Sequence, residues 1–208
     1  MPSLTRNTLR KELMERLYAT EDILYGTLDG TDTDTATANE WVSTMLTSTN
    51  LVGAWLFIDD TTDDLAPEAE SRRIISYNPA AGSVDVDPVF TAALGAGDLY
   101  EIHYAVHPDR LNEALQWAIT VGTNWAYAGF TDDITSVVIP DKDIMKEGAL
   151  FRIKQGLVRR ATGELKGELT SQLEEHRDSY YRGLEILGYR NPAQFGSQPT
   201  FQDRLGRI

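Results

Sequence analysis

The stretch RRIISYNPAAGSVDVDPVFTAALGAGDLYEIHY, residues 72–104, decides the fold of this chain of 208 residues. Apolar and polar residues alternate over residues 72–77, 83–86 and 98–106, as is typical of strands that bury one face. The five residues 78–82, NPAAG, suit the loop of a hairpin between the first two strands. The stretch therefore predicts a compact antiparallel β-unit, and no residue in it has an evident catalytic role.

The sequence before this stretch adds one more expected strand. Residues 51–58, LVGAWLFI, form a short apolar run rich in β-forming residues, which predicts a buried strand. Residues 59–70, DDTTDDLAPEAE, predict an exposed acidic loop. Residues 27–39, TLDGTDTDTATAN, predict a second polar loop because they are rich in Thr, Asp and Gly. Residues 39–47 fit a short helix or a strand, and both interpretations remain open.

Helical patterns lie on both sides of the β-unit. Residues 5–24 predict a helix, in which leucines recur at near-helical spacing among charged residues. These leucines are Leu9, Leu13, Leu17 and Leu24. A second helix is expected to begin at Pro108, because proline suits the first helical turn. Residues 142–188 predict a long helical region with a break near Thr162–Gly163, and the short run 134–139 predicts a further strand.

Together these elements predict an α+β fold. We expect a helical core, made of the N-terminal helix, a central helix and long C-terminal helices, with an inserted small antiparallel β-module and an extended C-terminal arm. Residues 1–50 would form the N-terminal helix and polar loop, residues 51–106 the β-module, and residues 107–188 the helical region that completes the core. Residues 189–208 would form the arm.

The expected arm, YRNPAQFGSQPTFQDRLGRI, has no helical period and contains prolines and glycines. It nevertheless holds five large aromatic or aliphatic residues, more than a purely solvated tail would have. These predicted interface residues are Tyr189, Phe195, Phe201, Leu205 and Ile208. The composition favours an arm that docks on a neighbouring subunit, while a tail folded back on its own domain remains an alternative.

The charge of the chain is unevenly distributed. The net charge is −13, yet residues 20–109 hold 17 Asp and Glu against only Arg72 and Arg73. Such acidity serves solubility, or it polarises a subunit that meets itself or a partner in a fixed orientation. A protein that coats nucleic acid is normally basic, so this acidity argues against that class. The sequence has no cysteine, which excludes disulfides, thiolate zinc sites and cysteine nucleophiles and suits assembly in a reducing cytoplasm.

Few residues suggest chemistry. His103 and His107 are four residues apart and could bind a metal together with Glu101, but Pro108 follows at once, so His107 is better interpreted as a junction between strand and helix. His176 is expected to be solvated. The segment DGTDTDT fails the EF-hand spacing, and the chain has no nucleophile elbow, P-loop or dinucleotide fingerprint. We therefore expect no catalytic residue, no metal and no cofactor; a metal-dependent hydrolase is the remaining enzymatic alternative.

The layout resembles the head-to-tail adaptor (connector) proteins of tailed bacteriophages, which extend the portal ring and receive the tail. Three features carry the resemblance: the β-unit RRIISY…GSVDVDPVF…GDLYEIHY, its direct fusion to HPDRLNEALQWAI, and the later helix SQLEEHRDSYYRGLEIL followed by an aromatic tail that contains proline. Members of this family are generally helical bundles, in which this β-unit would be an insertion. Similar β-units also suit other virion components, such as a tail-completion, baseplate or fibre-attachment protein.

The resemblance implies a structural protein of the virion neck, assembled in the host cytoplasm. The chain would form a homo-oligomeric ring, commonly of twelve copies, between the portal protein and the tail or its head-closure and tail-terminator proteins. DNA would pass through the lumen without specific binding, and no membrane would be involved. The acidic composition is compatible with such a conduit, because each contact with a phosphate adds affinity and so hinders passage.

Overall fold

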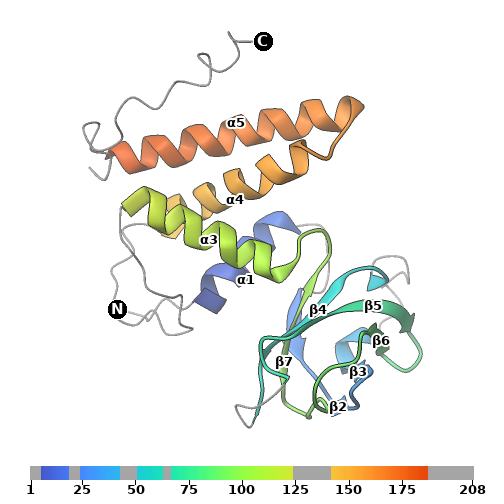
Figure 1. Ribbon diagram of the computed structural model, residues 1–208. Helices are drawn as coiled ribbons and strands as arrows, with labels where there is room; N and C mark the ends of the chain where they lie inside the picture. The colour runs from blue at the N-terminus through green and yellow to red at the C-terminus, as the bar shows by residue number, and fades with distance from the viewer. Residues whose placement is uncertain (1–5, 19–23, 43–50, 63–66, 124–141, 187–208) are drawn as a thin grey trace. The chain divides into compact units, whose positions relative to one another are not determined.

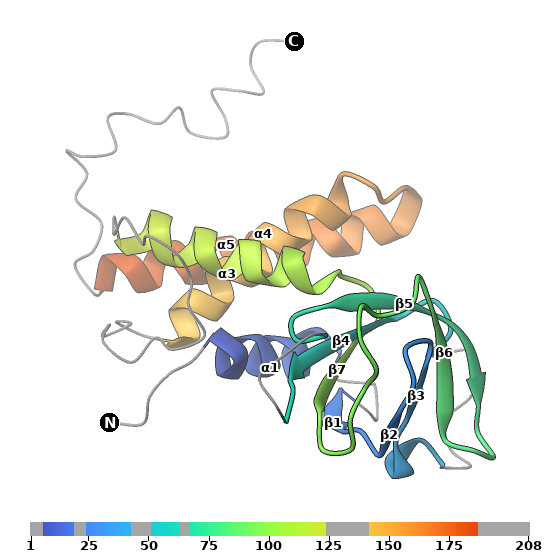
Figure 2. The same ribbon diagram turned by 60° about the horizontal axis from the view of Figure 1, so that its bottom comes forward.

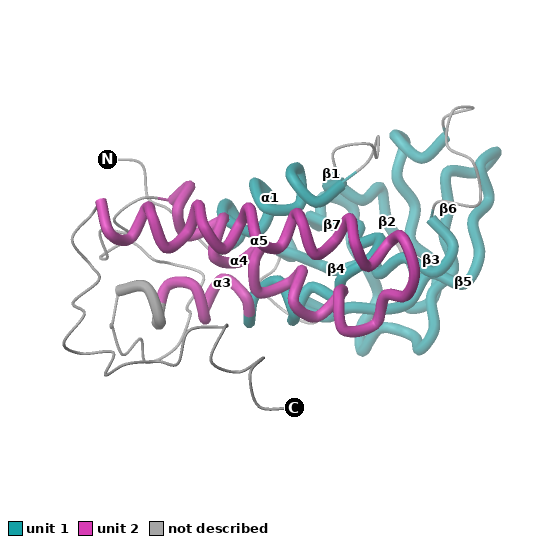
Figure 3. Tube along the Cα trace, turned by 90° about the horizontal axis from the view of Figure 1, so that it is seen from above, with its two compact units in different colours: residues 1–113, 130–135 teal, residues 114–129, 136–208 magenta. Residues whose placement is uncertain are grey.

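The computed structural model describes residues 6–18, 24–42, 51–62, 67–123 and 142–186 (Figure 1). The chain divides into two compact units (Figure 3). The first, here called the sheet unit, contains the described residues up to Glu113. The second, the helical unit, contains the described residues from Ala114 onward. The helix α3 (Pro108–Thr123) therefore contributes its first residues to the sheet unit and the rest to the helical unit.

A curled antiparallel sheet forms the body of the sheet unit (Figure 2). Its strands are β1 (Tyr25–Thr27), β2 (Gly30–Thr31), β3 (Thr35–Thr37), β4 (Trp55–Asp60), β5 (Ser71–Asn78), β6 (Ser83–Asp87) and β7 (Leu99–His103). They lie in the order β1-β7-β4-β5-β6-β3-β2. Six of the strands are three residues long or more, and the two-residue β2 lies at one edge of the sheet. The N-terminal helix α1 (Arg6–Leu17) belongs to the same unit.

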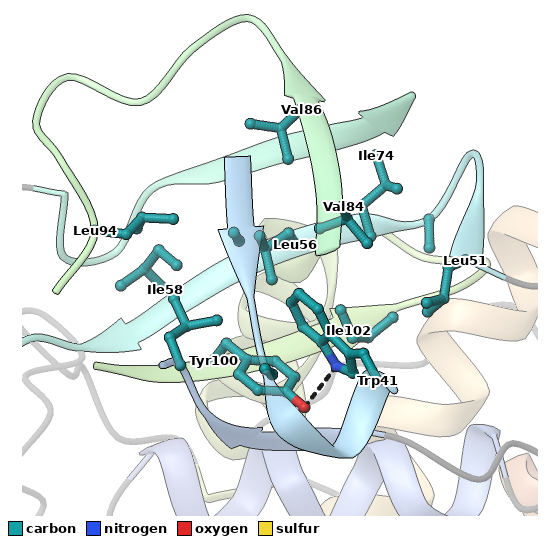
Figure 4. Packing of buried hydrophobic residues seen from close by; sticks show 14 of the residues in the cluster. Trp41, Leu51, Leu56, Ile58, Ile74, Val84, Val86, Leu94, Tyr100 and Ile102 are labelled. Carbon is teal, nitrogen blue, oxygen red and sulfur yellow. Dashed lines mark hydrogen bonds between the residues drawn. The ribbon is translucent and has the colours of Figure 1, made fainter. Parts of the chain in front are cut away.

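The concave face of the sheet encloses the apolar core of this unit (Figure 4). Alternate residues of the strands point into it, as the period of two along a strand requires. They include Leu56, Ile58, Ile74, Val84, Val86, Tyr100 and Ile102. Trp41, at the end of the 3-10 helix η1 (Asn39–Trp41), inserts its ring beside Tyr100 and donates a hydrogen bond from Nε1 to the Tyr100 hydroxyl at 2.8 Å. Burial raises the pKa of Tyr100, and its hydroxyl donates in turn to Glu40 Oε1.

The sheet is larger than the small module that the sequence predicts. The prediction that residues 27–39 form a loop is wrong, since β2 and β3 lie within it and β1 precedes it. Thr35–Thr37 pairs with β6, and Ala36 between the two threonines is fully buried against the core. Threonine is a good β-former, and the two threonines lie on the opposite side of the strand from Ala36. The sheet therefore begins before residue 51.

The other strands of the β-unit follow the expected pattern. Strands β5, β6 and β7 confirm the strands expected at 72–77, 83–86 and 98–106, although β7 ends at His103. Gly82, with φ of 58°, closes the hairpin between β5 and β6. The strand expected at 51–58 is shifted, since β4 runs from Trp55 to Asp60.

The helices also occur, with different limits. Helix α1 ends at Leu17, earlier than expected, and the long C-terminal region consists of α4 (Lys142–Val158) and α5 (Gly163–Ile186). The break falls at the predicted place, and α5 begins at Gly163, whose φ is 63°. The strand expected at 134–139 and the arm at 189–208 lie outside the described residues.

Close packing of three helices defines the helical unit. Helices α4 and α5 lie side by side as a hairpin, and the Tyr180 hydroxyl donates to the carbonyl oxygen of Ala118 in α3 at 2.6 Å. The Trp117 ring centroid lies 5.9 Å from those of both Phe151 and Tyr180. At this meeting point α4 carries Gly148, and a Cβ there would lie 2.6 Å from the Tyr180 ring and 2.9 Å from Ala118 Cβ. A side chain at position 148 would therefore separate the three helices.

The change Gly148→Ala is expected to destabilise the protein by about 1–3 kcal/mol, because the added methyl overpacks the contact with Tyr180. Gly156→Ala is the matched control in the same helix, since a Cβ there meets no atom within 4 Å. This control should increase stability by roughly 0.5–1 kcal/mol, because alanine is the better helix former. Urea unfolding followed by circular dichroism measures both changes. Equal effects of the two substitutions would contradict the close approach at Gly148.

Candidate functional site

The most unusual site in the described residues is a group of charged side chains inside the sheet unit. Arg10 of α1 has no exposed surface. Its Nε donates to Glu101 Oε2 at 2.7 Å and its Nη2 donates to Glu101 Oε1 at 3.0 Å. Nη2 also lies 2.5 Å from Asp59 Oδ1, and Nη1 donates to Asn112 Oδ1 at 3.2 Å. One guanidinium thus joins a helix to two strands and to the start of α3.

Strand pairing brings the two carboxylates together. Glu101 of β7 pairs with Phe57 of β4, and the Arg10 guanidinium lies 4.6 Å from the centre of the Phe57 ring. Asp59 lies at an irregularity in β4, where the register shifts between Ile58 and Asp60. Such bulges re-aim a side chain. Tyr100 and Ile102 point into the apolar core, so Glu101 between them points to the opposite face, which bonds to Arg10 of α1.

Two further residues complete what we call the charged cluster, which consists of Arg10, Lys11, Asp59, Glu101 and His103. Lys11 Nζ lies 2.7 Å from Asp59 Oδ2, and His103 Nε2 lies 2.9 Å from Glu101 Oε2. A carboxylate can only accept hydrogen bonds, so the proton between them belongs to His103 Nε2. The other ring nitrogen, Nδ1, is buried and has no hydrogen-bond partner among the described residues. With His103 neutral, the two cations and two carboxylates cancel.

The pKa values of three members of the cluster, Glu101, His103 and Asp59, are shifted in different directions. Burial opposes the charge of Glu101, but the hydrogen bond from His103 and the charge of Arg10 outweigh it, and the pKa of Glu101 is lowered. Burial also lowers the pKa of His103, and the favourable effect of Glu101 does not compensate for it. Burial and the nearby Glu101 charge raise the pKa of Asp59, which Lys11 and Arg10 only partly offset. The cluster is therefore an ionised Glu101 beside a neutral His103.

The geometry of the cluster suits a structural role. Arg10, Glu101 and His103 have no exposed surface, and each carboxylate already meets two donors of the cluster. A buried charge is tolerated when it is paired and hydrogen-bonded, and the loss of one partner leaves the other uncompensated. The cluster therefore fixes the position of α1 on the sheet. Tyr18 adds a second attachment, since its hydroxyl accepts a hydrogen bond from the Val106 amide at 3.1 Å.

The structure brings together only part of the metal group that the sequence suggests. Glu101 and His103 are in contact, but Arg10 also binds both oxygen atoms of Glu101. His107 lies apart: its Nε2 is 3.0 Å from Ser71 Oγ and its ring stacks edge-on against Trp55. Across the described ranges, no three His, Asp or Glu side chains are arranged to hold a metal ion. The alternative of a metal-dependent hydrolase therefore gains no support from these residues.

The prediction for His176 differs from the structure, and the predicted interface residues are not among the described ones. His176, expected to be solvated, is half-buried, and its Nδ1 lies 2.7 Å from Glu147 Oε2. The five predicted interface residues, Tyr189, Phe195, Phe201, Leu205 and Ile208, lie outside the described part of the chain. None of the described helices is long and apolar enough to cross a membrane.

Sequence reasoning missed Arg10 and Asp59. Arg10 counts among the charged residues of an amphipathic helix, and Asp59 falls in the expected exposed loop at 59–70, yet Asp59 is only 7% exposed. That part of the loop prediction is wrong, because Asp59 still belongs to β4. A signal was present: Arg10 precedes Leu13 by three residues on the apolar side of the helix, and Glu101 interrupts the apolar run of β7.

Removal of the central cation tests the cluster. Arg10→Met should destabilise the protein by about 3–5 kcal/mol, because Glu101 and Asp59 would stay buried without their shared partner. Arg16→Met, at an exposed position of the same helix, should change stability by no more than about 0.5 kcal/mol. Chemical denaturation of both variants gives the comparison. A small effect for Arg10→Met would mean that the cluster does not hold α1.

The pH dependence of stability tests His103. Its lowered pKa means that just below pH 6.5 the unfolded chain binds a proton that the folded chain does not, so stability falls as the pH decreases. The contribution is at most about 1.4 kcal/mol per pH unit. His103→Gln keeps a donor toward Glu101 but cannot titrate, so it should remove this slope below pH 6.5, the ordinary pKa of a histidine.

Urea unfolding across this pH range measures the slope, with His107→Gln as the control that should retain it. The raised pKa of Asp59 acts in the opposite direction and is present in all three proteins. The lowered pKa of Glu101 acts in the same direction as that of His103, but only near the ordinary titration range of a carboxyl group. An unchanged slope in His103→Gln would show that His103 is not the group that titrates.

Comparison of the chain with protein-family models, with curated proteins and with solved structures gave no match. The fold and the charged cluster therefore have to be interpreted from the physical chemistry of the chain itself.

Proposed function

We propose that this chain is a structural virion protein of a tailed bacteriophage, forming a homo-oligomeric ring in the neck that joins the portal to the tail. The observation that carries the proposal is the layout: β7 ends at His103, α3 begins at Pro108, and a helical hairpin of α4 and α5 follows. This order of elements resembles the layout of the head-to-tail adaptors. In this proposal the helical unit corresponds to the helical bundle of the adaptors, the sheet unit is the insertion, and residues 189–208 form the docking arm.

The internal charges support a role in assembly over one in chemistry. The buried ionisable groups of the charged cluster bind one another and connect α1, β4 and β7. A ring subunit that joins two larger assemblies needs fixed relative positions of its elements, and paired internal charges favour a single arrangement.

The distribution of charge supports the same proposal. Residues 1–113 together with 130–135 hold 22 Asp and Glu against 7 Lys and Arg, whereas the rest of the chain holds 10 against 12. The asymmetry of the sequence therefore coincides with the division into two units. An acidic unit beside a DNA path repels the duplex, which suits a conduit that must not bind its cargo.

The size of the sheet favours a second candidate. A seven-stranded sheet is more than an insertion in a small helical bundle, and it equally suits another virion component, such as a tail-completion, baseplate or fibre-attachment protein. Both candidates are structural proteins of the particle, and they differ in where the chain lies within it.

Genetic removal of the chain tests the proposal. Particles that lack it should package DNA but lose it or fail to join tails, because the neck would stay open. Electron microscopy and a measurement of encapsidated DNA give the result. Normal tailed particles without the chain would reject both candidates, whereas an antibody label on the baseplate of intact particles would favour the second.

A further inference from the structure

The distal end of the α4–α5 hairpin has an unusually open surface. We call residues 152–167 the hairpin tip. Leu165 is 57% exposed there, and residues 162–168 are exposed without interruption. A Cβ at Gly156 or Gly167 would meet no atom within 4 Å. The tip therefore presents an apolar residue and open helix surface to solvent.

The hairpin tip is also basic. It holds five Lys and Arg against the single acid Glu164. Arg159 and Arg160 are exposed, and within the described part of the chain neither side chain forms an ion pair. Such a tip favours a partner surface that is acidic and partly apolar.

The outward side of β6 and its neighbours has that character. We call Ile75, Asp85, Asp87 and Val89 the acidic face. Asp85 and Asp87 are exposed on alternate positions of β6, and Ile75 and Val89 are 54% and 53% exposed. The residues are neighbours, since Asp87 pairs with Arg73, Asp85 pairs with Ser76 and Arg72 Nε donates to the Val89 carbonyl oxygen.

Two cations of β5 border this face, and both are already engaged. Arg72 Nη2 lies 2.5 Å from Glu70 Oε2. The guanidinium of Arg73, which is opposite Asp87 in the register, lies 5.3 Å from the centre of the Trp55 ring. Asp85 accepts a hydrogen bond from Thr35 Oγ1 at 3.0 Å, but no Lys or Arg of the described residues forms an ion pair with Asp85 or Asp87. The negative charges of Asp85 and Asp87 are therefore available to an external partner.

We propose that the hairpin tip of one copy of this chain docks on the acidic face of the next copy. Arg159 and Arg160 would lie opposite Asp85 and Asp87, and Leu165 would cover the apolar pair of Ile75 and Val89. The two surfaces have opposite charge and both carry exposed apolar groups, which is the complementarity that steers and orients a contact. Because the surfaces differ, the contact is heterologous and closes into a ring where the rotation between copies permits it.

The choice of a second copy as the partner rests on the proposed function. The inference adds which surfaces meet, and it assigns Arg159, Arg160, Asp85 and Asp87 to the contact. It can fail while the proposed function stands, because a ring can also close through other surfaces.

The absence of cysteine makes a direct test possible. Asp87→Cys and Arg160→Cys are made in separate full-length chains, which are then mixed and oxidised. Every disulfide between the two chains is intermolecular by construction. It should form about tenfold faster than in a mixture of Asp87→Cys with Ser179→Cys, an exposed position of α5 outside the tip, because docking raises the effective concentration of the thiols. Gel electrophoresis of the tagged chains over time gives the rates, and equal rates would overturn the inference.

Charge reversal gives a second, independent test. Arg159→Glu with Arg160→Glu makes one variant, and Asp85→Lys with Asp87→Lys makes the other. Each variant alone should weaken self-association by about tenfold or more, because like charges then face each other. A mixture of the two should restore association, since each tip again meets a face of opposite charge. Sedimentation velocity at several concentrations measures this, and a mixture that associates no better than its components would overturn the inference, whatever the particle experiment shows.

Discussion

One buried guanidinium holds the sheet unit together. Arg10 binds Glu101 through two nitrogen atoms and Asp59 through one of them, so the helix α1, the strand β4 and the strand β7 share one charged contact. Three features of the chain meet at this contact: the place of α1, the irregularity of β4 at Asp59, and the direction of Glu101 away from the apolar core that Tyr100 and Ile102 enter. Apolar packing is non-directional and would allow α1 to slide along the sheet, whereas a forked guanidinium between two carboxylates defines one position.

The same contact limits which protonation states the fold tolerates. With His103 neutral, the formal charges of the cluster cancel, and every added or removed proton leaves a net charge in an apolar interior. The neutral state of His103 leaves its Nδ1 without a partner, which is a small defect compared with a third buried cation. Such a cluster contributes less to stability than to the choice of one arrangement, because the desolvation of its members offsets much of their attraction.

The sequence predicts the elements whose pattern is local and leaves out those that depend on distant partners. Strands β5, β6 and β7 show alternation over five residues or more, and α3, α4 and α5 have caps and breaks that can be read directly. Strand β3 is three polar or small residues long, and only its pairing with β6 and the burial of Ala36 make it a strand. Arg10 is predicted to be exposed because charged residues on an amphipathic helix usually are; its burial depends on acids 49 and 91 residues away. The proposed function rests on the resemblance of the layout to phage adaptors, and neither the fold nor the charged cluster implies it by itself.

The order of the strands has a consequence for how the chain is made. Two of the N-terminal strands pair with strands far along the chain. Strand β1 pairs with β7, with Tyr25 opposite Glu101, and β3 pairs with β6, with Thr35 opposite Asp85. On a ribosome, where the N-terminal part emerges first, β3 cannot join the sheet until β6 has been released, and β1 cannot join it until β7 has been released. Helices α4 and α5, in contrast, are neighbours along the chain and need only a short turn to meet. Residues 27–39 are rich in Asp and Thr, and charged side chains on an unpaired strand disfavour its pairing with another chain.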